Sequence, residues 1–241
     1  MIIPCIDLMD GKVVQLVQGR DKALEGGTPS EMLDRFKAFP EIQVIDLDAA
    51  IGNGFNDELV EFLAARCDAR IGGGVRSVER AQKLVQQGAK QVIIGTAAFD
   101  GNGINVPFLE QVAAAIGREK ILIALDSKHG KIVIKGWRES IDLTAEEVIA
   151  KLSPYAGGFL CTYVDKEGMM QGTDLDWFRR LREATDRDIT AAGGITTLDD
   201  VRALLGMNIH AALGMAIYTG RLDLAELARI NTEAMKTSPP A

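Results

Sequence analysis

Short apolar runs rich in β-branched residues alternate along the whole chain with longer stretches in which apolar residues recur every three or four positions. The short runs predict strands, which we place near residues 2–7, 42–47, 69–73, 91–95, 120–126, 158–163, 189–192 and 210–214. The longer stretches predict helices, for example at residues 29–39, 57–65, 78–87, 144–152, 175–184 and 198–205. Strands and helices that alternate in this way are typical of a parallel sheet with helical crossovers.

The chain also repeats itself at an interval of half its length. Gly74, in an Ile-Gly-Gly-Gly-Val run, corresponds to Gly194, in an Ala-Gly-Gly-Ile run, at an offset of 120 residues. Gly95 corresponds to Gly214 at an offset of 119 residues. The repeat indicates that the fold and any site at these turns have approximate two-fold symmetry.

The repeat decides the fold class. Each half, at about residues 1–118 and 119–236, carries four βα units, which are too few to close a barrel. Both halves together supply eight strands, so we predict an α/β fold in which residues 1–241 form a single (β/α)8 TIM barrel domain. An open doubly wound sheet is the alternative, and duplication into eight equivalent units favours closure over it.

Composition narrows the functional classes. Hydrophobic residues make up 47% and charged residues 25% of the chain, as expected for a globular protein with a large core. The net charge of −7 argues against a nucleic-acid partner, because a protein that binds nucleic acid normally needs a basic face to neutralise the many phosphates of its backbone. No apolar run is long enough for a membrane span and the start does not resemble a signal peptide, so we expect a cytoplasmic monomer without a membrane partner.

The sequence contains few residues suited to a metal or redox centre. Cys5, Cys67 and Cys161 are widely spaced and lack the close pairing of a zinc or redox motif. We expect them to be reduced packing residues. Two histidines are too few for a histidine-based metal centre. We therefore predict no metal site and assign acid–base chemistry to carboxylates.

Glycine-rich turns follow four of the predicted strands, in two matching pairs. In a barrel such turns lie at the mouth, where glycine lets backbone N–H groups approach an anion. We predict two phosphate cradles and hence a small-molecule substrate with a phosphate at each end; glycines that only form tight turns are the alternative. The candidate phosphate-binding residues are Gly73, Gly74, Arg76, Gly95, Thr96, Gly193, Gly194, Gly214 and Met215.

Two aspartates occupy equivalent strand ends in the two halves. Asp7 ends an Ile-Ile-Pro-Cys-Ile run and Asp126 ends an Ile-Leu-Ile-Ala-Leu run, at an offset of 119 residues. Strands one and five lie on opposite sides of an eight-stranded barrel, so the two carboxylates would flank the ligand. Different surroundings could make one an acid and the other a base. The alternative is that each only caps the following turn. Asp46 and Asp48 also follow a strand, but their place in the repeat is less clear.

Several motifs occur in order along nearly the whole chain: Pro4-Cys5-Ile6-Asp7-Leu8, Asp46-Leu47-Asp48-Ala49-Ala50, Gly-Gly-Gly-Val-Arg-Ser at 72–77, Asp126 before Gly130-Lys131, Gly136-Trp137, Thr162 and Ala192-Gly193-Gly194-Ile195. Together they resemble the histidine-biosynthesis isomerases that act on phosphoribosylformimino-aminoimidazole carboxamide ribotide (ProFAR). The resemblance implies an Amadori rearrangement of an aminoaldose to an aminoketose, on a substrate with two phosphates and without a metal or organic cofactor.

The resemblance also implies roles for individual residues. Asp126 would be the general acid that protonates the ribose ring oxygen, and Asp7 the base that removes the C2′ proton. Thr162 would hydrogen-bond near the reacting sugar or orient a carboxylate. Trp137 and Arg138 would lie in the loop that stacks an aromatic ring on the substrate's base.

Three further loops matter for the resemblance: the loop after the first strand, and two loops that depart from the family pattern. Gly19 and Arg20 belong to the first loop, where Arg20 could reach a phosphate or the carboxamide. The loop after strand six commonly reads Arg-Asp-Gly-Thr but is Lys166-Glu167-Gly168-Met169 here, and the usual Gly-Arg after strand eight is Gly214-Met215. These changes affect loop contacts and spare both aspartates.

Three alternative functions remain open. The cyclase subunit of imidazole glycerol phosphate synthase resembles this chain in its two aspartates and half-barrel repeat, although residues 15–20 and Gly136-Trp137 favour the isomerase. A dual-substrate isomerase would also act on phosphoribosylanthranilate. A non-catalytic phosphosugar-binding barrel would gain nothing from two opposed acids, since added negative charge repels anions.

Overall fold

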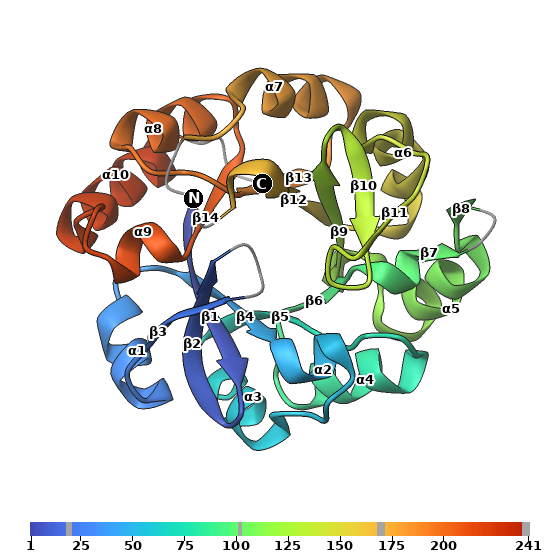
Figure 1. Cartoon of the computed structure of the whole chain (residues 1–241), viewed down its shortest axis with the longest axis horizontal. Helices are drawn as coiled ribbons and strands as arrows, with labels where there is room; N and C mark the ends of the chain where they lie inside the picture. The colour runs from blue at the N-terminus through green and yellow to red at the C-terminus, as the bar shows by residue number, and fades with distance from the viewer. Residues whose placement is uncertain (18–20, 101–102, 168–171, 238–241) are drawn as a thin grey trace.

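Eight parallel strands close into a barrel. The structure is a computed structural model, which describes residues 1–17, 21–100, 103–167 and 172–237. In order around the barrel the strands are β1 (Ile2–Met9), β4 (Glu41–Asp46), β5 (Asp68–Gly72), β6 (Gln91–Ile94), β9 (Ile121–Lys128), β12 (Gly158–Tyr163), β13 (Asp188–Ala192) and β14 (His210–Leu213). Pairing of β6 with β9 and of β14 with β1 completes the ring seen in Figure 1. The predicted TIM barrel is therefore confirmed and the open sheet is excluded.

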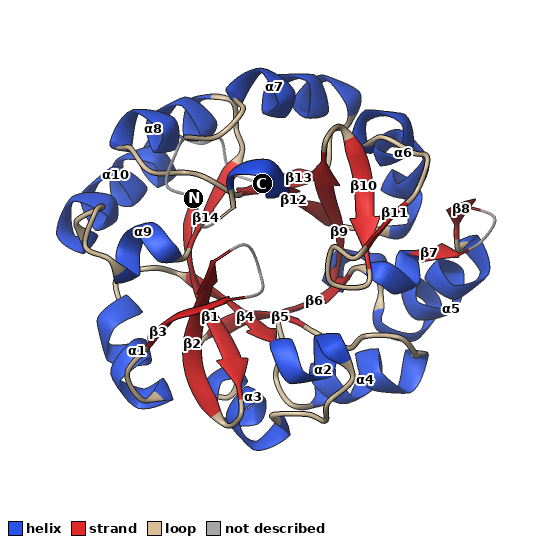
Figure 2. Ribbon diagram, viewed as in Figure 1, coloured by secondary structure: helices blue, strands red, loops and turns tan. Residues whose placement is uncertain are grey.

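Helices form an outer ring around the strands (Figure 2). They are α1 (Pro29–Phe36), α3 (Asp57–Ala64), α4 (Val78–Gln86), α5 (Val106–Ile116), α6 (Ala145–Leu152), α7 (Leu175–Ala184), α8 (Leu198–Gly206) and α10 (Leu224–Thr237). Helix α2 (Leu47–Ile51) and the 3₁₀ turn η4 (Val164–Lys166) directly follow strands, and helix α9 (Met215–Tyr218) and the 3₁₀ turn η1 (Thr96–Ala98) each follow a strand after one glycine. Two further 3₁₀ turns are η2 (Arg118–Lys120) and η3 (Ser153–Tyr155). None of the helices in the described ranges is both long and apolar enough to cross a bilayer.

Strands β1 and β9 run further than the sequence predicted, because each continues into a hairpin. Asp10 and Gly11 have φ values of 51° and 69° between β1 and β2 (Lys12–Val17), and His129 and Gly130 have 51° and 77° between β9 and β10 (Lys131–Ile134). Two successive positive φ values define the tight turn that suits a hairpin. The X-Gly pairs were the available sequence signal for these hairpins. The other additional strands are β3 (Asp21–Glu25), β7 (Phe99–Asp100), β8 (Gly103–Ile104) and β11 (Glu139–Ser140).

Side chains fill the interior of the barrel at the amino ends of the strands and leave it open at the carboxyl ends. At the amino ends of the strands, Arg70 crosses the interior, with its Nε 2.5 Å from Glu41 Oε2 and its Nη1 2.8 Å from Thr190 Oγ1. Above this lies a small apolar cluster formed by Ile93, Leu122, Leu160 and Ala212. The sealed lower layers leave the carboxyl ends of the strands as the open face of the barrel.

Candidate active site

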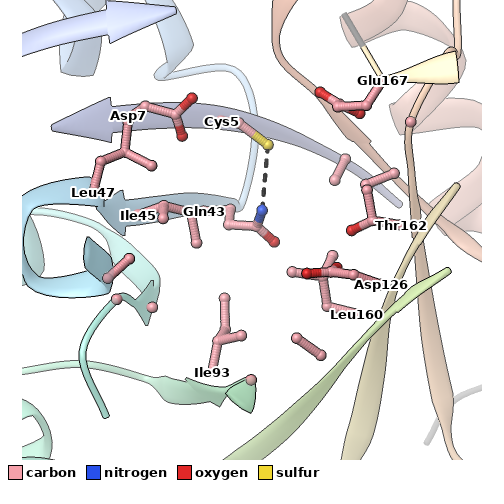
Figure 3. Close-up of a pocket in the computed structure, with 18 of the residues that line it drawn as sticks. Cys5, Asp7, Gln43, Ile45, Leu47, Ile93, Asp126, Leu160, Thr162 and Glu167 are labelled. Atoms are coloured by element: carbon pink, nitrogen blue, oxygen red, sulfur yellow. Dashed lines mark hydrogen bonds between the residues drawn. The ribbon is translucent and has the colours of Figure 1, made fainter. Parts of the chain in front are cut away.

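A pocket of about 310 Å³ lies at the carboxyl ends of the barrel strands. Its walls are the loops that follow strands of both halves, and its floor is the apolar interior of the barrel. The carboxylates of Asp7 and Asp126 face this space from opposite sides, and Glu167 points into it from above in the view of Figure 3. The pocket therefore has carboxylates where an acid–base reaction needs them.

Most of the predicted site residues line this pocket. They are Asp7, Asp126, Thr162, Gly73, Gly74, Arg76, Gly95, Thr96, Trp137, Gly193, Gly194, Gly214 and Met215. Arg138 does not line the cavity: it is exposed, and its N–H donates to the carbonyl of Ile134 at 3.2 Å. Its role in substrate binding stays a prediction. Gly19 and Arg20 lie outside the described residues.

The paired glycine turns have the same shape in the two halves. Gly73 and Gly193 have φ values of 104° and 94°. A Cβ atom would lie 2.1 Å from the carbonyl oxygen of Asp46 at Gly73, and 2.4 Å from that of Tyr163 at Gly193. Both the positive φ and the close backbone therefore require glycine. Glycine is therefore needed for the tight turn at both positions, and the turn brings the backbone to the pocket wall. Phosphate binding by these turns stays a prediction.

Gly95 and Gly214 form the second matching pair. Their φ and ψ angles are −99° and −107° for Gly95, and −110° and −98° for Gly214. Each precedes a short helical turn, η1 or α9, that begins at the edge of the pocket. The first N–H groups of a helical turn have no partner within it, so they can bind an anion. The two halves therefore present helical turns of the same shape to the pocket, and phosphate binding there stays a prediction.

The polar side chains beside these turns already have partners within the protein. Arg76 donates from Nη1 to the carbonyl of Ala49 at 3.0 Å, and so helps to hold helix α2. The hydroxyl of Thr96 accepts a 2.8 Å hydrogen bond from the N–H of Lys135. These side chains therefore shape the loops around the pocket.

Asp126 is surrounded by hydrogen-bond donors. The indole Nε1–H of Trp137 donates to its Oδ2 at 2.9 Å. Thr162, which pairs with Asp126 in the register of β9 and β12, donates from its hydroxyl. Burial raises the pKa of Asp126, and these two hydrogen bonds act against the rise by stabilising the ionised form. The expectation that Thr162 orients a carboxylate agrees with this arrangement.

Asp7 has a different neighbourhood. Its partner in the register of β1 and β4 is Ile45, which has no polar group to offer. Burial, and secondly the negative charge of Glu167, raise the pKa of Asp7 to about 7. Equivalent strand positions therefore carry carboxyl groups with different proton affinities.

Glu167 is a third acid that sequence reasoning missed. It follows turn η4, after β12, and burial together with the charge of Asp126 raises its pKa to about 7. The sequence analysis noted Lys166-Glu167 only as a departure from the usual Arg-Asp. The available signal was that both pairs keep a carboxylate in the second position.

Asp46 and Asp48 have structural roles. Asp46 caps helix α2 by accepting from the N–H of Ala49 at 3.1 Å, and it also accepts from the N–H of Asn56 at 2.8 Å. Asp48 accepts from the N–H of Asp10 at 2.7 Å and so holds the β1–β2 hairpin. Neither residue lines the pocket.

The described ranges contain no group of three or more His, Cys, Asp or Glu side chains that could hold a metal ion.

Comparison with known proteins adds independent information. A profile described as histidine biosynthesis protein matches residues 1–223. A protein of Methanocaldococcus jannaschii, named 1-(5-phosphoribosyl)-5-((5-phosphoribosylamino)methylideneamino) imidazole-4-carboxamide isomerase, is 38% identical over 95% of this chain and 98% of its own length. Proteins of the same name from Methanothermobacter thermautotrophicus and Myxococcus xanthus are 38% and 37% identical over 94% of this chain, and over 96% and 97% of their own lengths.

Proposed function

The chain belongs to the histidine biosynthesis protein family, and we propose that it is the aldose–ketose isomerase that converts ProFAR to its aminoketose. The observation that carries this proposal is the pair Asp7 and Asp126, facing each other across one pocket between two equivalent sets of glycine turns. A substrate with a phosphate at each end would place its central sugar between these carboxyl groups. The full-length isomerase relatives support the same reaction.

The reaction needs one acid and one base at the same pH. Asp7 and Glu167 both have a pKa of about 7, and the charge of Glu167 raises that of Asp7. Near neutral pH such a coupled pair holds about one proton. We assign the proton to Glu167, which donates it to the ribose ring oxygen as the ring opens to an imine. Ionised Asp7 then removes the C2′ proton, and the resulting enolamine rearranges to the ketone.

This assignment changes the role expected for Asp126. The hydrogen bonds from Trp137 and Thr162 stabilise its carboxylate form, which makes it a poorer proton donor than Glu167. We propose that Asp126 stays ionised and stabilises the positive charge that forms on the imine nitrogen. Trp137, fixed at Nε1 by Asp126, would present its ring to the substrate's base.

The test is an absorbance assay of the purified protein with ProFAR, without any glutaminase. Turnover to the aminoketose is the expected result. Parallel reactions should contain phosphoribosylanthranilate, or the aminoketose together with ammonium. Turnover of the first compound would add a second substrate, whereas consumption of the aminoketose with ammonium in place of ProFAR turnover would indicate the cyclase. Binding of ProFAR without any turnover would leave the phosphosugar-binding barrel.

A further inference from the structure

Gln43 has a buried side-chain amide in the pocket, and one end of this amide has no hydrogen-bond partner among the described residues. The side chain projects from β4 into the space between Asp7 and Asp126 (Figure 3), and the residue is only 5% exposed. Its Nε2 donates to Sγ of Cys5 at 3.6 Å. Its Oε1 is buried and has no hydrogen-bond partner among the described residues. The oxygen and nitrogen of such an amide are assigned from their hydrogen bonds, and in either orientation one end contacts Cys5 while the other stays unpaired.

Packing does not explain a glutamine at this position. Buried polar groups in proteins nearly always have a hydrogen-bond partner, so an unpaired amide needs another reason. The repeat offers a direct comparison, because Asp46 and Tyr163 occupy equivalent places beside the glycine turns. Three residues earlier in each strand are Gln43 and Leu160. Leu160 packs in the interior apolar cluster, so an apolar residue fits this position of the barrel.

We infer that Gln43 is a substrate-binding residue whose free amide end hydrogen-bonds a hydroxyl group of the sugar as it lies between Asp7 and Asp126. This inference rests on the proposed function. Gln43 lies two residues before Ile45, the register partner of Asp7, so its amide is one side-chain layer below that carboxyl group. A sugar hydroxyl both donates and accepts hydrogen bonds, and therefore suits either end of the amide. The contact fixes the depth at which the reacting carbons sit.

The test is Gln43→Leu, which reproduces the residue of the other half. We expect kcat/KM for ProFAR to fall about 10- to 100-fold, because leucine cannot form the hydrogen bond to the sugar hydroxyl and leaves that hydroxyl unpaired in the pocket. We also expect the melting temperature to stay the same or rise, because the substitution removes an unpaired buried polar group. Binding of inorganic phosphate should not change, since the glycine turns are untouched. Gln43→Met serves as a second variant of similar length.

The matched control is Gln91→Leu, at another barrel-strand glutamine, whose Nε2 donates to the carbonyl of Glu119 outside the pocket. It should leave kcat/KM unchanged. If both Gln43 variants keep kcat/KM within threefold of the parent protein, the inference is wrong. It is also wrong if both variants fail to fold, because Gln43 would then be a structural residue. A parent protein without ProFAR turnover would instead contradict the proposed function, so the two failures are distinguishable.

Discussion

The two halves of the barrel carry a carboxylate at the same strand position but surround it differently. Asp7 lies beside Ile45, whereas Asp126 lies beside Thr162 and also accepts a hydrogen bond from Trp137. The pKa of Asp7 rises to about 7, while hydrogen bonds restrain the rise for Asp126. A symmetric scaffold thus produces an asymmetric site through a few neighbouring side chains.

Structural features shared by the halves support this comparison. The hairpin after β1 is held by Asp48, which accepts from the N–H of Asp10 at 2.7 Å. The hairpin after β9 is held by Asp165, which accepts from the N–H of His129 at 2.8 Å. These two loop carboxylates are alike in the halves, whereas the register partners of the two pocket aspartates, Ile45 and Thr162, differ.

Among the substitutions that test this comparison, Asp7→Asn should lower kcat the most. Replacing the base with an amide of similar size should lower kcat about 10³-fold, the range typical of general acid–base catalysis. Substrate binding should remain, because the glycine turns are unchanged. Steady-state kinetics and an equilibrium binding measurement check this together. Turnover within tenfold of the parent protein would remove Asp7 from the mechanism.

Glu167→Gln tests whether Glu167, and not Asp7 or Asp126, is the general acid. We expect kcat to fall about 10²-fold. If Glu167 must be protonated, the alkaline limb of the pH profile of kcat/KM, near pH 7 from its raised pKa, should disappear in the variant. Asp126→Asn is the matched comparison and should retain that limb. A profile that loses its alkaline limb only with Asp126→Asn would return the role of acid to Asp126.

Exchanging the register partners of the two aspartates tests whether these neighbours cause the difference in pKa between Asp7 and Asp126. Thr162→Val removes one donor to Asp126 with little change of shape, and we expect about a tenfold loss of kcat from the lost charge-assisted hydrogen bond. Ile45→Thr places a hydroxyl beside Asp7 and should lower the pKa of Asp7, which moves the acidic limb of the kcat/KM profile to lower pH. An unmoved limb would mean that Ile45 does not control Asp7.

The glycine turns should respond equally, because the halves share their geometry there. Gly73→Ala and Gly193→Ala each push a Cβ into a backbone carbonyl at a positive φ, so we expect about 1–3 kcal/mol of destabilisation and weaker phosphate binding in both. Gly130→Ala, with nothing within 4 Å of its Cβ, is a control for the φ effect alone. Thermal unfolding and phosphate titration measure both quantities. A large difference between the Gly73 and Gly193 variants would contradict equivalent cradles.

The smallest expected effect is on the pH dependence of stability. The pKa values of Asp7 and Glu167 rise from 3.8 and 4.5 to about 7 in the folded protein. Between about pH 4 and 7 the folded state therefore binds more protons than the unfolded state, and the contribution of these groups to the free energy of unfolding falls as pH rises. The double variant Asp7→Asn with Glu167→Gln should lose less stability than the parent between pH 5 and 8. An identical slope in denaturant unfolding would mean that these groups titrate normally.

Local patterns in the sequence were enough to predict most of the framework. Apolar periodicity placed the eight strands, and the repeat predicted that they close into a barrel. Asp7 and Asp126 were identifiable because each ends an apolar strand run at the same place in the repeat, and the carboxyl ends of barrel strands lie at the mouth. The long hairpins were missed, although the Asp10-Gly11 and His129-Gly130 pairs were visible.

The sequence by itself determined the barrel, the twin glycine turns and the two opposed aspartates, because spacing along the chain and the two-fold repeat fix these features. Only the tertiary structure decided which groups share the pocket. It brought Thr162 beside Asp126, placed Glu167 at the pocket and left the side-chain oxygen of Gln43 unpaired. The physical reason is that proton affinity depends on neighbours a few ångströms away, and closure of the barrel brings such neighbours together from strands far apart in the sequence.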